Sequence, residues 1–243
     1  MQLGMVYFLF VWSGFVRSSL GFGGAAFAMP LMLLIVNEPL LWLPIIANHL
    51  LIFSILTVYD RLKNIDWTSL GRGLVILIIP KLIGVFGLLH LPNEVLAIII
   101  YGVTFIYGLT WVFNYTFASK NRVVDGVLLV IGGYASGTSL VGAPLISAVF
   151  ARHVLVQKLR DTLFLLWMIL VTIKVSTFVV LDVDLQFAYT LYFLPMVAAG
   201  HWLGLQAHNY LIQGKGERYK AVLGSILLLI CCYGLWKNVL AYG

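Results

Sequence analysis

Two runs of glycine and hydroxyl residues interrupt an otherwise apolar chain, and their residue types could bind an anion. The first run covers residues 14–25 and the second covers residues 133–144. They align with a spacing of 119 residues, as at Gly23 and Gly142 (142−23). Glycines let the backbone approach a ligand closely, and a helix that begins after such a run presents free N–H groups and a positive dipole end. We therefore expect an anion-binding helix start after each run.

Basic residues deep in apolar segments add the positive charge that an anion site needs. Arg17 lies within the first run, just before Gly21, and Lys81 lies halfway along an apolar segment, directly after Pro80. Charges inside a membrane are costly and are functional candidates by default. Lys174 lies nearer a segment end, so we expect its amine to reach the membrane surface, and for His49 we favour an interhelical hydrogen bond over a proton relay. The candidate substrate-binding residues are Arg17, Ser18, Ser19, Gly21, Phe22, Gly23, Gly24, Asn48, Lys81, Gly137, Thr138, Ser139, Gly142 and Ala143.

The composition places these residues in a membrane protein. Of the 243 residues, 62% are hydrophobic and only 10% are charged, whereas a soluble domain carries roughly 25% charged residues. The net charge of +6 is carried mostly by short loops, so it does not indicate a nucleic-acid partner. Cys231 and Cys232 are adjacent and lack metal-ligand spacing, so we expect packing roles, no metal and no cofactor.

The apolar segments form two similar series. The first pair of apolar segments, residues 3–20 and 25–36, lies on either side of the glycines at 21–24. The segment at 25–36, with about a dozen residues, is too short to cross a ~30 Å hydrocarbon core. Residues 126–141 and 143–151 repeat this arrangement around the second run. Each pair predicts a re-entrant helical hairpin. The segments long enough to cross are 40–59, 69–91 and 95–117 after the first pair, and 162–181, 186–207 and 221–240 after the second.

Among the loops and turns, lysine and arginine occur only in alternate ones. The basic loops cover residues 60–66, 119–125, 152–160 and 213–220, whereas the turns at 37–39, 91–94 and 182–184 are acidic or neutral. The positive-inside rule then places the basic loops in the cytoplasm and both termini outside it. The predicted fold is an all-α polytopic membrane protein with two inverted-topology repeats, residues 1–118 and 119–243, each a re-entrant hairpin plus three transmembrane helices. Inverted repeats would bring the two helix starts to one midplane site.

The two runs resemble those of the TauE/SafE sulfite-exporter family, also called TSUP transporters. The residues that carry the resemblance are residues 19–24 with Pro30 downstream, and Gly133, Gly137 and residues 142–144 at the start of the second half. The resemblance covers the whole chain in its length and in its arrangement as two repeats. The second run departs from the family pattern at Leu140 and Ala143, where glycines are common.

The resemblance implies an inner-membrane carrier of small anions whose re-entrant elements line the substrate site. We expect a secondary transporter, an exporter by family analogy, that moves sulfite, a sulfonate or another small organic anion by alternating access. No ATP-binding motif is present, so the proton-motive force or the substrate gradient would supply the energy. The expected partners are the anionic substrate and the lipid bilayer, with proton coupling and a homodimer left open, and no nucleic acid. Arg17, proposed from its depth alone, and Lys81 would balance the substrate charge.

Two other functions are compatible with parts of the sequence. A passive anion channel would use the same residues. An intramembrane serine protease would use Ser136 and His201, whose neighbours superficially resemble the rhomboid motifs. The residue two before Ser136 is Tyr134 rather than the glycine of those motifs, so we do not expect an enzyme.

Overall fold

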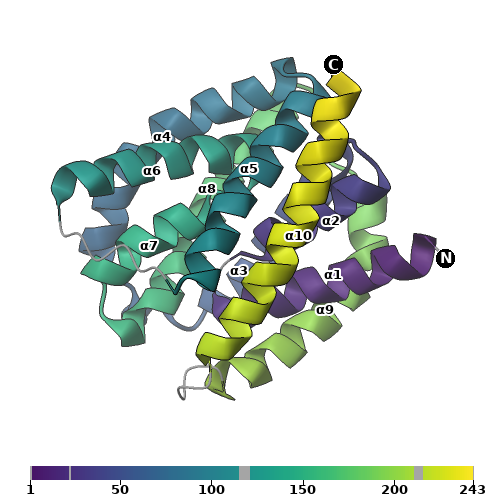
Figure 1. The fold of residues 1–243 in the computed structure, drawn as a ribbon. Helices are drawn as coiled ribbons and strands as arrows, with labels where there is room; N and C mark the ends of the chain where they lie inside the picture. The colour runs from purple at the N-terminus through teal and green to yellow at the C-terminus, as the bar shows by residue number, and fades with distance from the viewer. Residues whose placement is uncertain (1, 22, 115–120, 211–215, 243) are drawn as a thin grey trace. The chain divides into compact units, whose positions relative to one another are not determined.

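The protein is all-helical in the part of the chain that the structure describes. The computed structural model describes residues 2–21, 23–114, 121–210 and 216–242, and these residues form ten α-helices, one 3-10 helix and no strand (Figure 1). The elements are α1 (Gln2–Leu20), α2 (Gly24–Ile35), α3 (Pro39–Val58), η1 (Leu62–Asn64), α4 (Trp67–His90), α5 (Asn93–Val112), α6 (Arg122–Ser139), α7 (Ala143–His153), α8 (Val156–Val180), α9 (Phe187–Tyr210) and α10 (Gly216–Tyr242).

Six helices are long and apolar enough to cross a membrane. Within the described residues these are Leu3–Leu20, Pro39–Val58, Trp67–His90, Asn93–Val112, Val156–Val180 and Ala221–Leu240. The prediction of an all-α polytopic membrane protein is thereby confirmed. Helix α9 has 24 residues and matches the predicted span over 186–207 in length, but His201, Gln206 and His208 lower its hydropathy. The re-entrant hairpins, the inverted repeats and the division at residue 118 remain predictions.

The chain forms two compact units. Unit 1 comprises Met1–Trp42, Leu91–Thr116 and Phe193–Gly243, and unit 2 comprises Leu43–His90 and Phe117–Tyr192. Unit 1 therefore holds α1, α2, α5, α10 and most of α9. Unit 2 holds α4, α6, α7, α8 and most of α3.

Close helix crossings organise unit 1. Helices α5 and α10 run alongside each other (Figure 1), and the ring of Tyr101 packs against the backbone at Gly234, where any added Cβ would collide with it. The Tyr101 hydroxyl donates to Pro30 O at 3.1 Å, which ties α5 to α2. Gly200 of α9 lies directly against Val11 O of α1. These contacts fix the surroundings of the α1–α2 pair.

Unit 2 is built around the crossing of α4 and α6, which lie side by side (Figure 1). Gly84 and Gly137 meet at this crossing, and a Cβ on Gly137 would lie 2.8 Å from Gly84 Cα. Small residues let helix backbones approach closely in membranes. The crossing therefore brings the middle of α4 to the C-terminal end of α6.

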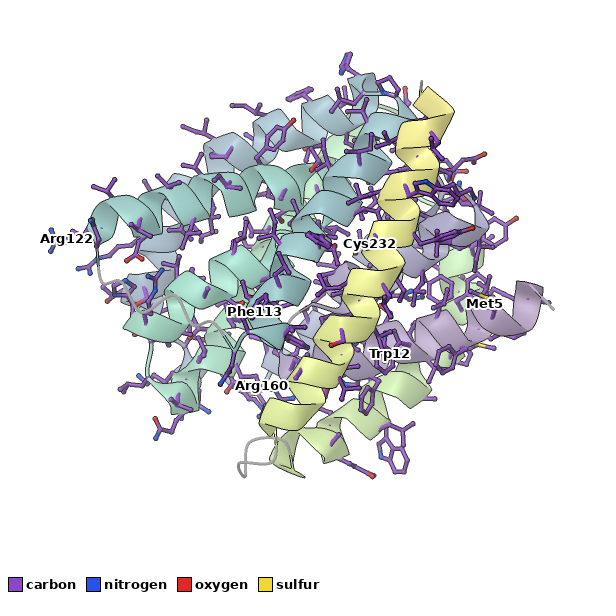
Figure 2. The ribbon with its side chains drawn as sticks, viewed as in Figure 1. Met5, Trp12, Phe113, Arg122, Arg160 and Cys232 are labelled. Atoms are coloured by element: carbon purple, nitrogen blue, oxygen red, sulfur yellow. The ribbon has the colours of Figure 1, made fainter. Side chains whose placement is uncertain are left out.

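Two helices in unit 2 begin earlier than the sequence predicts. Helix α6 begins at Arg122, which projects outward from its first turn (Figure 2), rather than at residue 126. Helix α8 begins at Val156 rather than at residue 162. The buried carboxylate of Asp161 is contacted by Arg61 Nη1 at 3.8 Å and by Asn64 Nδ2 at 3.3 Å. Partners from the segment between α3 and α4 allow charged residues to lie inside α8 instead of in a solvated loop.

Candidate functional site

The two helix breaks have the same length. Helix α1 ends at Leu20 and α2 begins at Gly24, whereas α6 ends at Ser139 and α7 begins at Ala143. Both pairs of boundaries differ by the 119 residues that separate the two runs (139−20 and 143−24). The sequence therefore located both breaks correctly.

The residue after each first helix adopts a left-handed backbone. The φ angle is 81° at Gly21 and 58° at Leu140, which are again 119 residues apart (140−21). Gly23 is also left-handed, with φ 84°. Only glycine adopts this conformation without steric cost. Among the described residues, the left-handed positions of the first break are glycines, whereas the second break has a buried leucine at its left-handed position.

The remaining predicted residues of the breaks close each helix pair tightly. A Cβ on Gly24 would lie 2.8 Å from Ser13 O, and one on Gly142 would collide with Gly132 O. Neither α2 nor α7 has a side-chain N-cap hydrogen bond. Helix α7 begins at the buried Ala143 and has Pro144 in its first turn, which removes one N–H donor. The first turn of α2, residues 24–27, contains no proline and so carries one more backbone N–H than the first turn of α7.

A basic and hydroxyl cluster lies at the first break, within unit 1. Arg17 is only 5% exposed, and its Nη2 lies 3.4 Å from Nδ1 of His201 on α9. Ser18 Oγ lies 2.5 Å from the same nitrogen. Gly200 and Gly204 allow this approach, because a Cβ on either would strike the backbone of α1. The predicted residues Arg17 and Ser18 are thus brought together with a histidine that is 183 positions away from Ser18.

The other predicted hydroxyl donors, Ser19, Thr138 and Ser139, point back into their own helices. Ser19 Oγ donates to Val16 O at 3.2 Å, and Ser139 Oγ donates to Ala135 O at 2.8 Å. Thr138 Oγ1 likewise donates to backbone carbonyls of α6 at 3.2 Å. In this conformation these hydroxyls can accept a hydrogen bond but do not present a donor. Of the predicted hydroxyl donors, only Ser18 makes its contact with another helix.

Two lysines meet at the second break, within unit 2. Lys81 Nζ donates to Ser136 O at 3.2 Å and contacts Ser136 Oγ at 3.1 Å. Lys174 Nζ donates to Gly137 O at 2.6 Å. Both lysine side chains are fully buried, at 0% exposure. The expectation that Lys174 reaches the membrane surface is therefore wrong, because the carbonyl at the end of α6 binds its amine inside the unit.

Two polar residues of α3 that the sequence analysis considered, Asn48 and His49, lie outside these clusters. Asn48 Nδ2 donates to Leu185 O at 2.8 Å and to Thr190 Oγ1 at 3.1 Å, so the amide hydrogens join α3 to the beginning of α9. His49 Nε2 contacts Thr190 O at 2.8 Å, which confirms the interhelical hydrogen bond.

Phe22 lies outside the described residues. No group of three or more His, Cys, Asp or Glu side chains that could hold a metal ion occurs in the part of the chain that the structure describes.

Sequence analysis alone did not assign His201, His208 and Lys174 to the breaks. His208 Nδ1 contacts Ser19 O at 2.7 Å. None of these residues belongs to a recognised motif, and their contacts at the breaks come from distant parts of the sequence. A weak signal was available in α9, where His201 and His208 lie two helical turns apart and so face the same side.

An all-α polytopic membrane protein with buried basic residues at two helix breaks has features that are typical of membrane transporters. The family model described as sulfite exporter TauE/SafE matches residues 6–234, and the chain belongs to this family. Comparison with the curated proteins and with the solved structures gave no match. The family consists of membrane transporters of anions rather than enzymes, so the chain acts in a lipid bilayer on an anionic substrate.

Proposed function

We propose that this chain is a secondary transporter that exports a small sulfur-containing anion, such as sulfite or a sulfonate, across the cell inner membrane by alternating access. The observation that supports this proposal most directly is the cluster at the first break. There, the buried Arg17 lies beside Ser18 and His201, close to the start of α2. Family membership supports the anion class and the direction.

The chemistry of the Arg17 cluster suits an oxyanion. A guanidinium carries five N–H donors in a planar fork that matches two oxygens of one acceptor group. Buried positive charge attracts an anion strongly, because little water screens it. The free N–H groups at the start of α2 supply further donors. The proton-motive force or the substrate gradient would drive the cycle.

Uptake into proteoliposomes tests the proposal. The reconstituted protein should accumulate labelled sulfite or taurine, and Arg17→Gln should lower the initial rate at least tenfold, which corresponds to about 1.4 kcal/mol. Gly23→Leu should have a similar effect, because a side chain at a φ of 84° distorts the break. Arg122→Gln is the matched control, since Arg122 is exposed at the start of α6. Unchanged uptake in both Arg17→Gln and Gly23→Leu would contradict the proposal.

A further inference from the structure

The end of α6 holds a second cluster of basic side chains, which is distinct from the Arg17 cluster. Lys81 approaches it from α4 and Lys174 approaches it from α8, and their acceptors belong to the consecutive residues Ser136 and Gly137. Two amines therefore lie at the same turn of α6. Both side chains are fully buried.

Carboxylates do not compensate this pair. Helix α4 contains no Asp or Glu, and α6 and α8 contain one each, Asp125 and Asp161. Asp125 pairs with Arg152 and His153, and Asp161 pairs with Arg61. Asp125 precedes Ser136 by 11 residues (136−125), or about 16 Å along the helix. None of the salt bridges among the described residues includes Lys81 or Lys174.

The donors of this cluster are only partly used. An ammonium group carries three hydrogens. Lys81 directs two contacts to Ser136, and Lys174 directs one to Gly137 O, with its Nζ also 5.5 Å from the centre of the Phe178 ring. As ammonium groups the pair therefore retains three further hydrogens. Ser136 Oγ accepts from Lys81, and no described acceptor takes its own hydroxyl hydrogen.

Two like charges in a poorly screened interior repel each other. An anion beside them removes this repulsion and accepts the remaining hydrogens. We propose that Lys81, Lys174 and the Ser136 hydroxyl form a binding site for a small oxyanion with two or more oxygens, of the sulfite or sulfonate class. This proposal rests on the proposed transport function and names, within unit 2, a second group of residues that would contact the substrate during transport.

A purely structural role makes a different prediction. Lysine side chains near a helix C-terminus bind its last carbonyls and interact favourably with the helix dipole. If Lys174 only capped α6, its loss would lower the unfolding temperature of the free protein. The dependence of that temperature on anion concentration would then remain unchanged. A binding site requires that the anion dependence itself changes.

The test is the unfolding temperature of the purified full chain, titrated with sulfite. A ligand that binds the native state raises this temperature by mass action. Lys174→Met and Ser136→Ala should raise the half-saturating sulfite concentration at least tenfold, and Lys174→Arg should raise it less, because it keeps the charge. Lys237→Met, on the exposed face of α10, should titrate like the wild type. Wild-type half-saturation in Lys174→Met and Ser136→Ala would overturn this site.

A second measurement needs no variant. Cyanate carbamylates lysine amines, and peptide mass spectrometry quantifies the product at each lysine. Any modification of the buried Lys81 and Lys174 that the free protein shows should fall when sulfite is added, whereas that of the exposed Lys237 should not. Equal and measurable modification of Lys81 and Lys174 with and without sulfite would overturn the site. A wild-type protein that neither binds nor transports sulfite or taurine would instead refute the proposed function. A wild type that transports while its Lys174 variants bind normally would refute only this inference.

Discussion

At the residue scale, the two helix breaks differ in the residue at their first left-handed position. Gly21 and Leu140 occupy equivalent left-handed positions, but only glycine does so without cost. A left-handed backbone costs other residues roughly 1–2 kcal/mol. Leu140 is 6% exposed, so burial of its side chain offsets this cost. The departure from the family pattern at Leu140 is therefore a local strain that packing compensates.

Gly23→Ala should lower the free energy of unfolding by about 1–2 kcal/mol, because φ there is 84°. Among the described residues, the added Cβ would meet the Phe27 ring at 3.5 Å, which is ordinary van der Waals contact. Unfolding in detergent micelles, followed by circular dichroism, measures the change. Gly4→Ala is the control, since nothing lies within 4 Å of its Cβ position in α1. Equal stability of Gly23→Ala and Gly4→Ala would contradict this account of the break.

Depth in an apolar segment was enough to predict burial for Arg17 and Lys81, because a hydrophobic segment leaves a charged side chain few alternatives. The same argument was wrong for Lys174, which lies closer to the end of α8. Its position depends on a carbonyl of α6 that lies 37 residues away in the sequence. A single sequence does not reveal such a long-range partner. His201 was not assigned to the first break for the same reason.

At the element scale, the helix breaks were predictable because glycine and proline act locally. Both starts, at Gly24 and Ala143, are where the sequence placed them. The start of α8 was not predictable, because its charged residues suggested a solvated loop. Tertiary contacts override that preference: Asp66 N donates to Thr162 Oγ1 at 3.0 Å, and Asp161 binds Arg61 and Asn64.

A charged cluster joins the start of α6 to the end of α7. Asp125 contacts Arg152 Nη2 at 2.5 Å and His153 Nε2 at 2.6 Å. Asp125→Asn should lower the free energy of unfolding by about 1–3 kcal/mol, because it removes the charge from a largely buried pair. Asp60→Asn is the control: Asp60 is 75% exposed and 3.8 Å from Arg61, so the expected loss is below about 0.5 kcal/mol. Chemical unfolding measures the loss in both variants. Equal losses in the free energy of unfolding for Asp125→Asn and Asp60→Asn would contradict a structural role for the cluster.

At the scale of the whole molecule, the distribution of charge predicts the orientation. Basic residues of the described loops and helix starts, such as Lys63 and Lys158, lie on the side that we assign to the cytoplasm. Alkaline phosphatase fused after residue 243 should therefore be active, and green fluorescent protein fused there should be dark. The same reporters inserted after Lys63 should give the opposite result. A fluorescent fusion at residue 243 would show that the orientation is inverted.

Transport by a carrier that exposes its site to one side at a time is the central claim, and counterflow tests it most directly. Proteoliposomes are loaded with excess unlabelled sulfite and diluted into a trace of labelled sulfite. An alternating-access carrier should accumulate the label transiently above equilibrium, and Arg17→Gln should abolish this overshoot. A monotonic approach to equilibrium together with unitary currents in planar bilayers would show a passive anion channel instead. Absence of any protein-dependent flux of sulfite or taurine would contradict the proposed substrate class.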